Sequence, residues 1–351
     1  MTDRRASIPC TIVTGALGSG KTTLIRSLLE QPDMAGTALI VNEFGEVGLD
    51  HLILSSAVET TLLMDSGCLC CSLRGDIVDT VLSLFSAVER GDTPPFDRIL
   101  IETTGLADPI PIVRDLTSSP ALRDRVHLCR VVTCVDGLVG QAELRSNDVA
   151  VDQVAQADVC LITKTDLADP LQIDLLSEAL TLINPLVSVV RVVGEQGASS
   201  DLLFGAGPVE MHRPQTSGER AAALDLKAGG HDHDHHHDHE HHDSVHTGVD
   251  SWSTVISHSL PWQAIRDWID LVYSLNAARI LRAKGVLWIQ ESDKPVLFQA
   301  VGPILSPPVL LSGWEGRPPE SRLVFITKNF DLEILELSFE NTVLRGVAEC
   351  P

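Results

Sequence analysis

The chain contains the sequence Gly15-Ala16-Leu17-Gly18-Ser19-Gly20-Lys21-Thr22 between a short apolar run and a helix-length segment. This sequence matches GxxxxGK(S/T), the pattern of a phosphate-binding loop that joins a strand to a helix. Its glycines let backbone N–H groups turn toward phosphate oxygens, and the N-terminus of the following helix favours negative charge. The motif therefore predicts a nucleotide-binding domain.

The residues of this loop have separate expected roles. Lys21 is expected to reach the β and γ phosphates, and the Thr22 hydroxyl is expected to bind Mg²⁺. Contacts to the nucleotide phosphates are expected from Gly15, Gly18, Ser19, Gly20, Lys21, Thr22 and Thr23. Downstream, Glu102 ends an apolar run and is followed by Thr103, Thr104 and Gly105. Its carboxylate can hold Mg²⁺ through water and the Gly105 N–H can contact the γ phosphate, the alternative being a solvated acid.

Short apolar runs alternate with helix-length segments from residue 8 to about residue 203. Strands are predicted at Cys10–Thr14, Thr37–Val41, Thr61–Met64, Ile99–Glu102, Leu128–Val135, Val159–Thr163 and Val187–Val193. Helices are predicted at Lys21–Leu29, Asp76–Arg90, Asp148–Gln156 and Leu171–Ile183. The strands are apolar on both faces, which is typical of a parallel sheet covered by helices on both sides. We expect an α/β P-loop NTPase with a doubly wound, mostly parallel sheet.

The pattern changes after Phe204, which predicts three parts: the P-loop domain over residues 1–204, a flexible linker over 205–248 and a second domain over 249–351. In the last part, strands are predicted at Trp252–Ser257, Gly285–Gln290, Val296–Val301 and Leu323–Thr327, and helices at Pro261–Leu275 and from Asp331. Consecutive strands joined by short turns favour an antiparallel sheet. We therefore expect a small α+β C-terminal domain.

A second sequence feature bears on the identity of the base. Thr163-Lys164-Thr165-Asp166 ends an apolar run, where the NKxD guanine motif of GTPases would lie. Asp166 can accept two N–H bonds from guanine, which adenine does not offer, and Lys164 can lie over the ring. Thr163 stands where the motif has Asn. GTP is favoured because a hydrogen-bond mismatch at a base edge is costly inside a site.

Three cysteines lie within four residues, at Cys68, Cys70 and Cys71. Thiolates are soft ligands suited to zinc, to Cu(I) and, at tetrahedral sites, to cobalt. Three thiols leave a fourth position open, which suits transfer better than storage because structural zinc sites are usually closed. A redox thiol pair or simple packing is the alternative. We favour zinc, with cobalt as the second choice.

A second metal feature is a low-complexity tract with eight histidines among residues 231–242, interleaved with acids. Imidazoles of this kind bind zinc, nickel or cobalt weakly and at several positions. The candidate ligands are His231, His233, His235, His236, His237, His239, His241 and His242. The tract is interpreted as a flexible metal-collecting arm, and a merely solvated linker is the alternative.

The composition excludes some classes of partner. The 351 residues carry a formal net charge of −22, so nucleic acid and anionic membranes are not expected to bind. No uninterrupted apolar run approaches the roughly 20 residues that a membrane-spanning helix needs. The first nine residues contain no apolar segment of signal-peptide length. A cytoplasmic protein is therefore expected.

Six segments, taken in order, resemble the CobW-type metallochaperone GTPases, which are relatives of the urease and hydrogenase nickel-insertion GTPases. They are Gly15–Thr23, Val41–Asp50, Ser66–Cys71, Glu102–Pro109, Leu281–Trp288 and Leu323–Ile326. The GCxCC pattern is specific to this family, whereas the phosphate loop alone is not. By this resemblance the three cysteines are the metal-motif positions, and Asn42–Asp50 is the switch segment. Thr163 in place of Asn leaves the base preference open.

The resemblance implies a Mg²⁺-dependent GTPase, converting GTP to GDP and phosphate, that delivers a transition metal to a client metalloprotein. GTP would order the switch segment and the cysteine motif for metal binding, and hydrolysis would release the metal. No general base is obvious, and Glu43 or Glu46 is the candidate for positioning water. The rival hypotheses are a passive metal buffer that uses the histidine tract and an ATP-dependent activator of one metalloenzyme. The sequence leaves open whether the protein forms a homodimer.

Overall fold

A computed structural model describes residues 7–42, 62–63, 69–72, 76–193, 199–205, 248–312 and 319–344. Contacts divide the chain into two compact units. The first unit comprises Met1–Glu178 and Val187–Val209, and the second comprises Ala179–Leu186 and Glu210–Pro351. Within the described ranges, no helix is long and apolar enough to cross a membrane.

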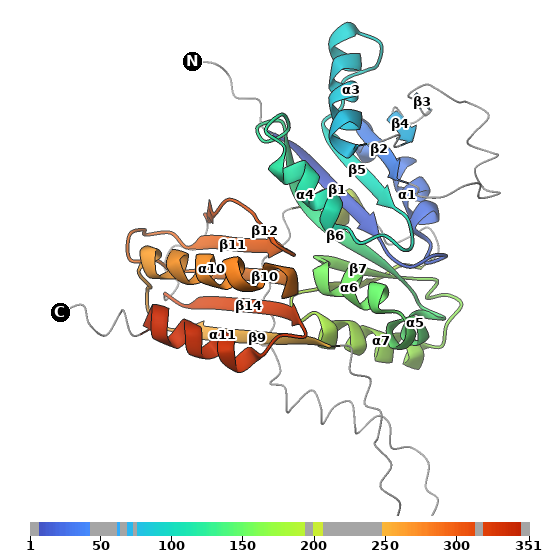
Figure 1. Cartoon of the computed structure of the whole chain (residues 1–351). Helices are drawn as coiled ribbons and strands as arrows, with labels where there is room; N and C mark the ends of the chain where they lie inside the picture. Colours follow the sequence, from blue (N-terminus) through green and yellow to red (C-terminus); the bar gives the residue numbers. More distant parts are fainter. Residues whose placement is uncertain are drawn as a thin grey trace, which may run out of the picture. The chain divides into compact units, whose positions relative to one another are not determined.

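The described part of the first unit contains an eight-stranded sheet with the order β3-β4-β2-β5-β1-β6-β7-β8. The strands are β1 Ile8–Thr14, β2 Thr37–Asn42, β3 Leu62–Leu63, β4 Leu69–Ser72, β5 Arg98–Thr103, β6 Val126–Asp136, β7 Val159–Thr163 and β8 Ser188–Arg191. All neighbours are parallel except β3 and β4. β1 lies between β5 and β6, as Figure 1 shows. The carboxyl ends of the central strands therefore meet at one edge, where ligands bind in such sheets.

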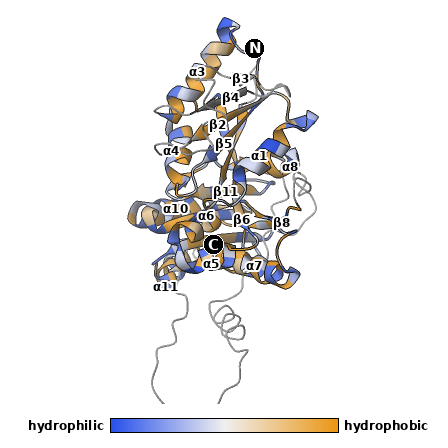
Figure 2. Ribbon diagram, turned by 90° about the vertical axis from the view of Figure 1, so that its right-hand side faces the viewer, coloured by the Kyte–Doolittle hydropathy of each residue, from blue (hydrophilic) through white to orange (hydrophobic). Residues whose placement is uncertain are grey.

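Helices cover both faces of this sheet. They are α1 Lys21–Leu29, α3 Ile77–Arg90, α4 Ile110–Ser118, α5 Gly140–Ser146, α6 Asp148–Gln156, α7 Pro170–Ile183 and α8 Ser200–Phe204, with a 3₁₀ turn η1 at Pro32–Met34. In Figure 2, α3 and α4 lie on one side of β2 and β5, and α1 and α8 lie on the other. The strands there are hydrophobic along their length, whereas the helices are mixed, as expected for a doubly covered sheet.

Local sequence explains where several helices begin. The Asp76 carboxylate accepts a hydrogen bond from the Val78 N–H at the start of α3, at 2.8 Å. Asn147 caps α6 in the same way through the Val149 N–H, at 3.0 Å. Such caps satisfy N–H groups that the first turn leaves without a helical partner. α4 is preceded by Pro109 as its N-cap residue and has Pro111 in its first turn, where a proline fits because the N–H groups there need no helical partner.

The second unit contains an antiparallel sheet with the order β12-β11-β10-β14-β9, and β13 also pairs with β11. Its strands are β9 Val249–Ile256, β10 Ile280–Leu287, β11 Val296–Val301, β12 Ile304–Leu305, β13 Val309–Leu310 and β14 Ser321–Lys328. Its helical segments are α10 Trp262–Asn276, the 3₁₀ turn η2 Ala277–Arg279, α11 Leu332–Phe339 and the π-helical segment η3 Glu340–Leu344. The predicted α+β class is confirmed.

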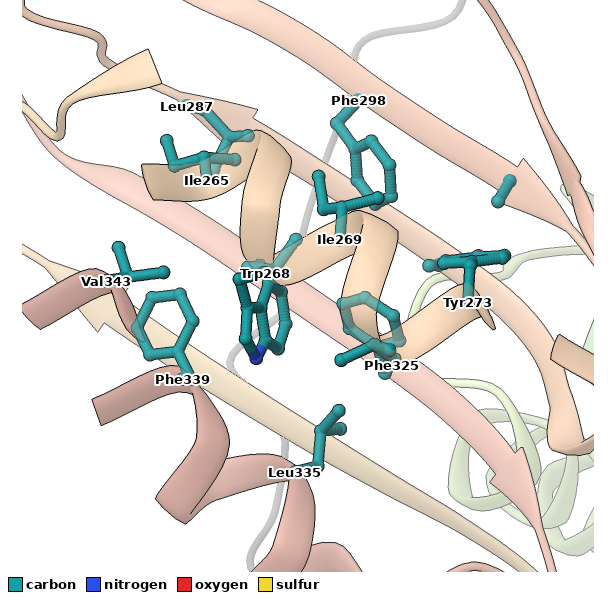
Figure 3. Close-up of a cluster of buried hydrophobic side chains, with 14 of the residues drawn as sticks. Ile265, Trp268, Ile269, Tyr273, Leu287, Phe298, Phe325, Leu335, Phe339 and Val343 are labelled. Carbon is teal, nitrogen blue, oxygen red and sulfur yellow. The ribbon is translucent and has the colours of Figure 1, made fainter. Parts of the chain in front are cut away.

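An aromatic cluster forms the core of the second unit. Trp268 of α10 is fully buried, and its ring meets Phe325 of β14 and Phe339 of α11 at centroid distances of 5.4 and 4.9 Å. Figure 3 shows Trp268 between the sheet and α11. The indole N–H donates to the Ser338 hydroxyl at 2.9 Å, so its polar atom is satisfied. Trp268 therefore joins both helices to the sheet.

The sequence-based segments agree with most of these elements, including β7, β11, α1 and α6 at both ends. Elements that were not predicted are β4, α4, α5, α8 and the short strands β12 and β13. α4 escaped prediction because Pro109 and Pro111 resemble a loop in sequence. β4 was not predicted because its four residues lack an alternating or extended apolar pattern. It forms a strand by pairing with β2 and β3.

Replacing Trp268 with alanine should lower the free energy of unfolding by about 3–5 kcal/mol, because it leaves a cavity between two helices and a sheet. Urea unfolding followed by circular dichroism measures this change. Leu275→Ala is the matched control on the same helix, since Leu275 is 71% exposed, and should change the value by no more than about 0.5 kcal/mol. Equal effects of the two substitutions would contradict the assigned core.

Candidate nucleotide-binding site

The phosphate loop follows β1 and has an unusual backbone at its glycines. Gly15, Gly18 and Gly20 have φ angles of +133°, +76° and +84°, values that L-residues with side chains rarely adopt. A Cβ atom on Gly15 would lie 2.2 Å from the Cys134 carbonyl oxygen. The loop can therefore lie against the end of β6 only because Gly15 lacks a side chain.

Lys21 opens α1 and is buried with its ammonium group turned back over this loop. Its Nζ donates to the carbonyl oxygens of Gly15 and Ala16 at 2.8 and 2.9 Å. Burial lowers the pKa of Lys21, and the Cys134 and Glu102 groups act in the opposite direction. The ammonium group is thus held at the loop, where phosphate oxygens can replace the two carbonyl partners.

Thr22 and Glu102 meet at the same edge of the sheet. The Thr22 hydroxyl donates to Glu102 Oε1 at 2.5 Å, and the Glu102 side chain is buried at the end of β5. Two oxygen donors of this kind are the hard ligands that Mg²⁺ takes, with water and phosphate oxygens completing its shell. The residue pair therefore fits a magnesium site.

The segment after Glu102 is packed tightly against the phosphate loop. The Thr103 hydroxyl donates to the Thr14 hydroxyl at 2.8 Å, and a Cβ atom on Gly105 would lie 2.4 Å from the Leu17 nitrogen. On its other side, Gln153 of α6 donates to the Ala107 carbonyl at 2.9 Å. A movement of the phosphate loop would consequently displace the segment Thr103–Ala107, because the two are in direct contact.

Two of the three proposed base-binding residues, Thr163 and Lys164, contact the phosphate loop. The Thr163 hydroxyl donates to the Ser19 carbonyl at 2.8 Å. Lys164, which has a φ of 54°, donates through Nζ to the Gly18 carbonyl at 2.8 Å. Asp166 lies in the following turn and is exposed to solvent, so its carboxylate is available to a ligand. The three residues share one edge with the phosphate loop.

Two acids at this edge were missed by the sequence analysis. Asp136 ends β6, is 4% exposed and forms an ion pair with Lys164 at 2.5 Å. Glu143 of α5 lies near it, and burial together with the Asp136 charge raises the pKa of Glu143. Asp136 could have been found by the signal that identified Glu102, an acid at the carboxyl end of a buried parallel strand.

The cysteine motif reaches the same sheet through β4. Backbone pairing places Cys70 beside Leu39 and Cys71 beside Ile40. The next pair, Ser72 and Val41, is level with Glu102, because β2 pairs Val41 with Glu102. Two strand spacings, about 10 Å, thus separate the backbone after Cys71 from the end of β5.

Several predicted site residues lie outside the described residues. They are Glu43, Glu46 and the rest of the switch segment after Asn42, Cys68, and the histidines of residues 231–242; only the backbone is described for Cys70 and Cys71. Within the described part of the chain, no three His, Cys, Asp or Glu side chains are grouped to hold a metal ion. The four cysteines whose side chains are described are free thiols, and burial raises the pKa of Cys134 to about 12.

Family models match two long segments of the chain. Residues 9–191 match the CobW/HypB/UreG nucleotide-binding domain, and residues 249–343 match the cobalamin synthesis protein cobW C-terminal domain. The zinc chaperone YjiA of Escherichia coli K12 is 29% identical over 334 residues, which span 95% of this chain and 98% of YjiA. The zinc chaperone CobW of Sinorhizobium sp is 36% identical over 200 residues, spanning 48% of this chain and 55% of that protein.

A solved structure extends this similarity to the fold. The crystal structure of Zn(II)-bound YjiA GTPase from E. coli matches with a TM-score of 0.73 at 27% identity. The match covers 96% of this chain and 99% of that one. With its P-loop, its Thr22–Glu102 pair and both matching domains, the chain belongs to the CobW/HypB/UreG family of nucleotide-binding proteins.

Proposed function

We propose that this protein is a GTP-hydrolysing metallochaperone that binds zinc through Cys68, Cys70 and Cys71 and delivers it to a client protein under nucleotide control. Relatives named zinc chaperones support the class of activity and the choice of metal. Cobalt is the second choice. The nucleotide is GTP, the product is GDP, and Mg²⁺ is the resident cofactor.

One observation carries this proposal. β4, which contains Cys70 and Cys71, is hydrogen-bonded to β2, and β2 is hydrogen-bonded to β5 with Glu102 at its end. Two of the three proposed metal-binding cysteines therefore lie on a strand of the sheet that contributes Glu102 to the candidate nucleotide site. A displacement of β5 or β2 caused by the nucleotide would reach the cysteines through two backbone ladders.

The residues at the sheet edge have separate proposed roles in GTP binding and hydrolysis. Lys21 exchanges its carbonyl partners for phosphate oxygens, and Thr22 and Glu102 hold the magnesium shell. A magnesium ion held by these two residues would neutralise charge that develops on the phosphates. Asp166 accepts hydrogen bonds from the guanine edge, and Glu43 is proposed to position the attacking water. Loss of GTP contacts at Gly105 after hydrolysis would free the segment that packs on Leu17.

Metal release requires that the two nucleotide states differ in metal affinity. A zinc ion bound equally well in both states cannot be released by hydrolysis. A site of three thiolates with an open fourth position would in addition give the metal a route of transfer, because a client ligand can enter the open position before the cysteines leave. The eight histidines of residues 231–242 are proposed to collect metal ions and to be dispensable for GTP hydrolysis.

Two rivals predict different behaviour. A passive buffer would bind zinc through the histidine tract, with an affinity that is independent of nucleotide and of the three cysteines. An ATP-dependent activator would prefer ATP to GTP, and nucleotide competition separates it from the proposed GTPase. Asp166→Asn should relax the preference for guanine only if Asp166 reads the base edge.

Replacing Lys21 with alanine should lower the rate of GTP hydrolysis by about 10²-fold or more, because a buried cation at the transferred phosphate is lost. Release of phosphate in the presence of Mg²⁺ measures the rate. The matched control is Arg26→Ala, an exposed cation on the same helix, which should hydrolyse GTP at the wild-type rate. An active Lys21→Ala protein would refute the assigned phosphate site.

Cys70→Ser, made in a protein from which residues 231–242 are deleted, should remove tight zinc binding. A serine hydroxyl stays protonated at neutral pH and is a poor zinc ligand compared with a thiolate. Competition with a chromophoric chelator measures the affinity. Cys129→Ser is the control, since Cys129 is a half-buried free thiol on β6. Unchanged zinc affinity in Cys70→Ser would favour the passive buffer.

A further inference from the structure

Asp136 has two carboxylate oxygens that serve two different partners. Its Oδ1 accepts hydrogen bonds from the Leu138 and Val139 N–H groups, at 2.8 and 3.4 Å, and so closes the turn after β6. Its Oδ2 lies 2.5 Å from the Lys164 ammonium group. The side chain is buried, with 6% of its surface exposed. One oxygen therefore shapes the turn, and the other is free to act on the lysine.

Lys164 is held from two directions. Its Nζ donates to Asp136 Oδ2 and also to the Gly18 carbonyl of the phosphate loop, at 2.8 Å. The backbone supports this placement, because the Gly137 N–H donates to the Thr163 carbonyl at 2.9 Å and thereby ties the turn to the end of β7. A lysine side chain on a four-carbon stem has considerable rotamer freedom. Both contacts together fix it in one position.

The surrounding charges make Asp136 the principal counter-ion of this lysine. Glu143 also attracts Lys164, although no hydrogen bond joins the two side chains in the described structure. The neighbouring Thr163 makes an uncharged contact with the phosphate loop, because its hydroxyl donates to the Ser19 carbonyl at 2.8 Å. Charge-assisted hydrogen bonds are roughly twice as strong as neutral ones. The contact between Asp136 and Lys164 joins two charged groups, whereas the contact that Thr163 makes with Ser19 joins two neutral ones.

We propose that Asp136 is a positioning residue for guanine-nucleotide binding, which acts by holding Lys164 against the Gly18 carbonyl. The lysine stem is then ordered at the end of β7 before a nucleotide arrives, and binding does not have to order it. The inference rests on the proposed function, since it assigns Asp136 to the base-binding side of the same site. It also gives the chain a second link between the base site and the phosphate loop, beside Thr163.

A double-mutant cycle with Asp136→Asn and Lys164→Ala tests this proposal. Asparagine keeps an oxygen for the Leu138 N–H and removes the charged acceptor of the lysine, so the turn after β6 is retained. Binding of GDP and of ADP to the nucleotide-free proteins is measured by calorimetry, and thermal unfolding reports on folding. Asp158→Asn is the matched control, because the Asp158 carboxylate accepts a backbone N–H at the opposite end of β7.

The expected result is a GDP dissociation constant about tenfold higher for Asp136→Asn, from loss of a charge-assisted contact. Lys164→Ala should weaken GDP binding at least as much, and the double variant should bind GDP like Lys164→Ala alone. Equal weakening by Asp136→Asn in both backgrounds, or none in either, would overturn the proposal. A wild-type protein that binds ADP as tightly as GDP would instead refute the guanine site itself, and this inference with it.

Discussion

The nucleotide site depends on two close backbone approaches that only glycine permits. A Cβ atom on Gly15 would lie 2.2 Å from the Cys134 carbonyl oxygen, and one on Gly105 would lie 2.4 Å from the Leu17 nitrogen. Because these atoms are absent, the carboxyl ends of β5, β1 and β6 converge on one loop. Lys21, Thr22 and Glu102 are brought together by this convergence, and the proposed binding of phosphate and Mg²⁺ uses all three.

The same sheet offers a physical route for the proposed control of metal binding by nucleotide. β5 carries Glu102, the proposed magnesium ligand, and is hydrogen-bonded to β2, and β2 is hydrogen-bonded in turn to the strand that contains Cys70 and Cys71. On the other side of β1, the ends of β6 and β7 tie the base-binding residues to the phosphate loop. The residues proposed for base recognition and phosphate binding and the cysteines of β4 therefore lie along one row of strands.

Much of this arrangement could be predicted from sequence because its signals are local. The phosphate loop, the apolar strand before it and the helix at Lys21–Leu29 follow one another directly in the sequence. The acid at the end of β5 is likewise recognised from the apolar residues just before it. The contact between Asp136 and Lys164 could not be predicted, since it joins residues 28 positions apart through the left-handed backbone at Lys164. β4 was also missed, because pairing with its neighbours, and not its own pattern, makes it a strand.

The zinc dissociation constant in two nucleotide states tests the central claim most directly. The protein, with residues 231–242 deleted, is titrated with zinc in the presence of a non-hydrolysable GTP analogue and then in the presence of GDP. The account predicts binding that is tighter with the analogue by about tenfold, the size of a typical coupling between two sites. Equal zinc affinity with the analogue and with GDP would contradict nucleotide-controlled delivery.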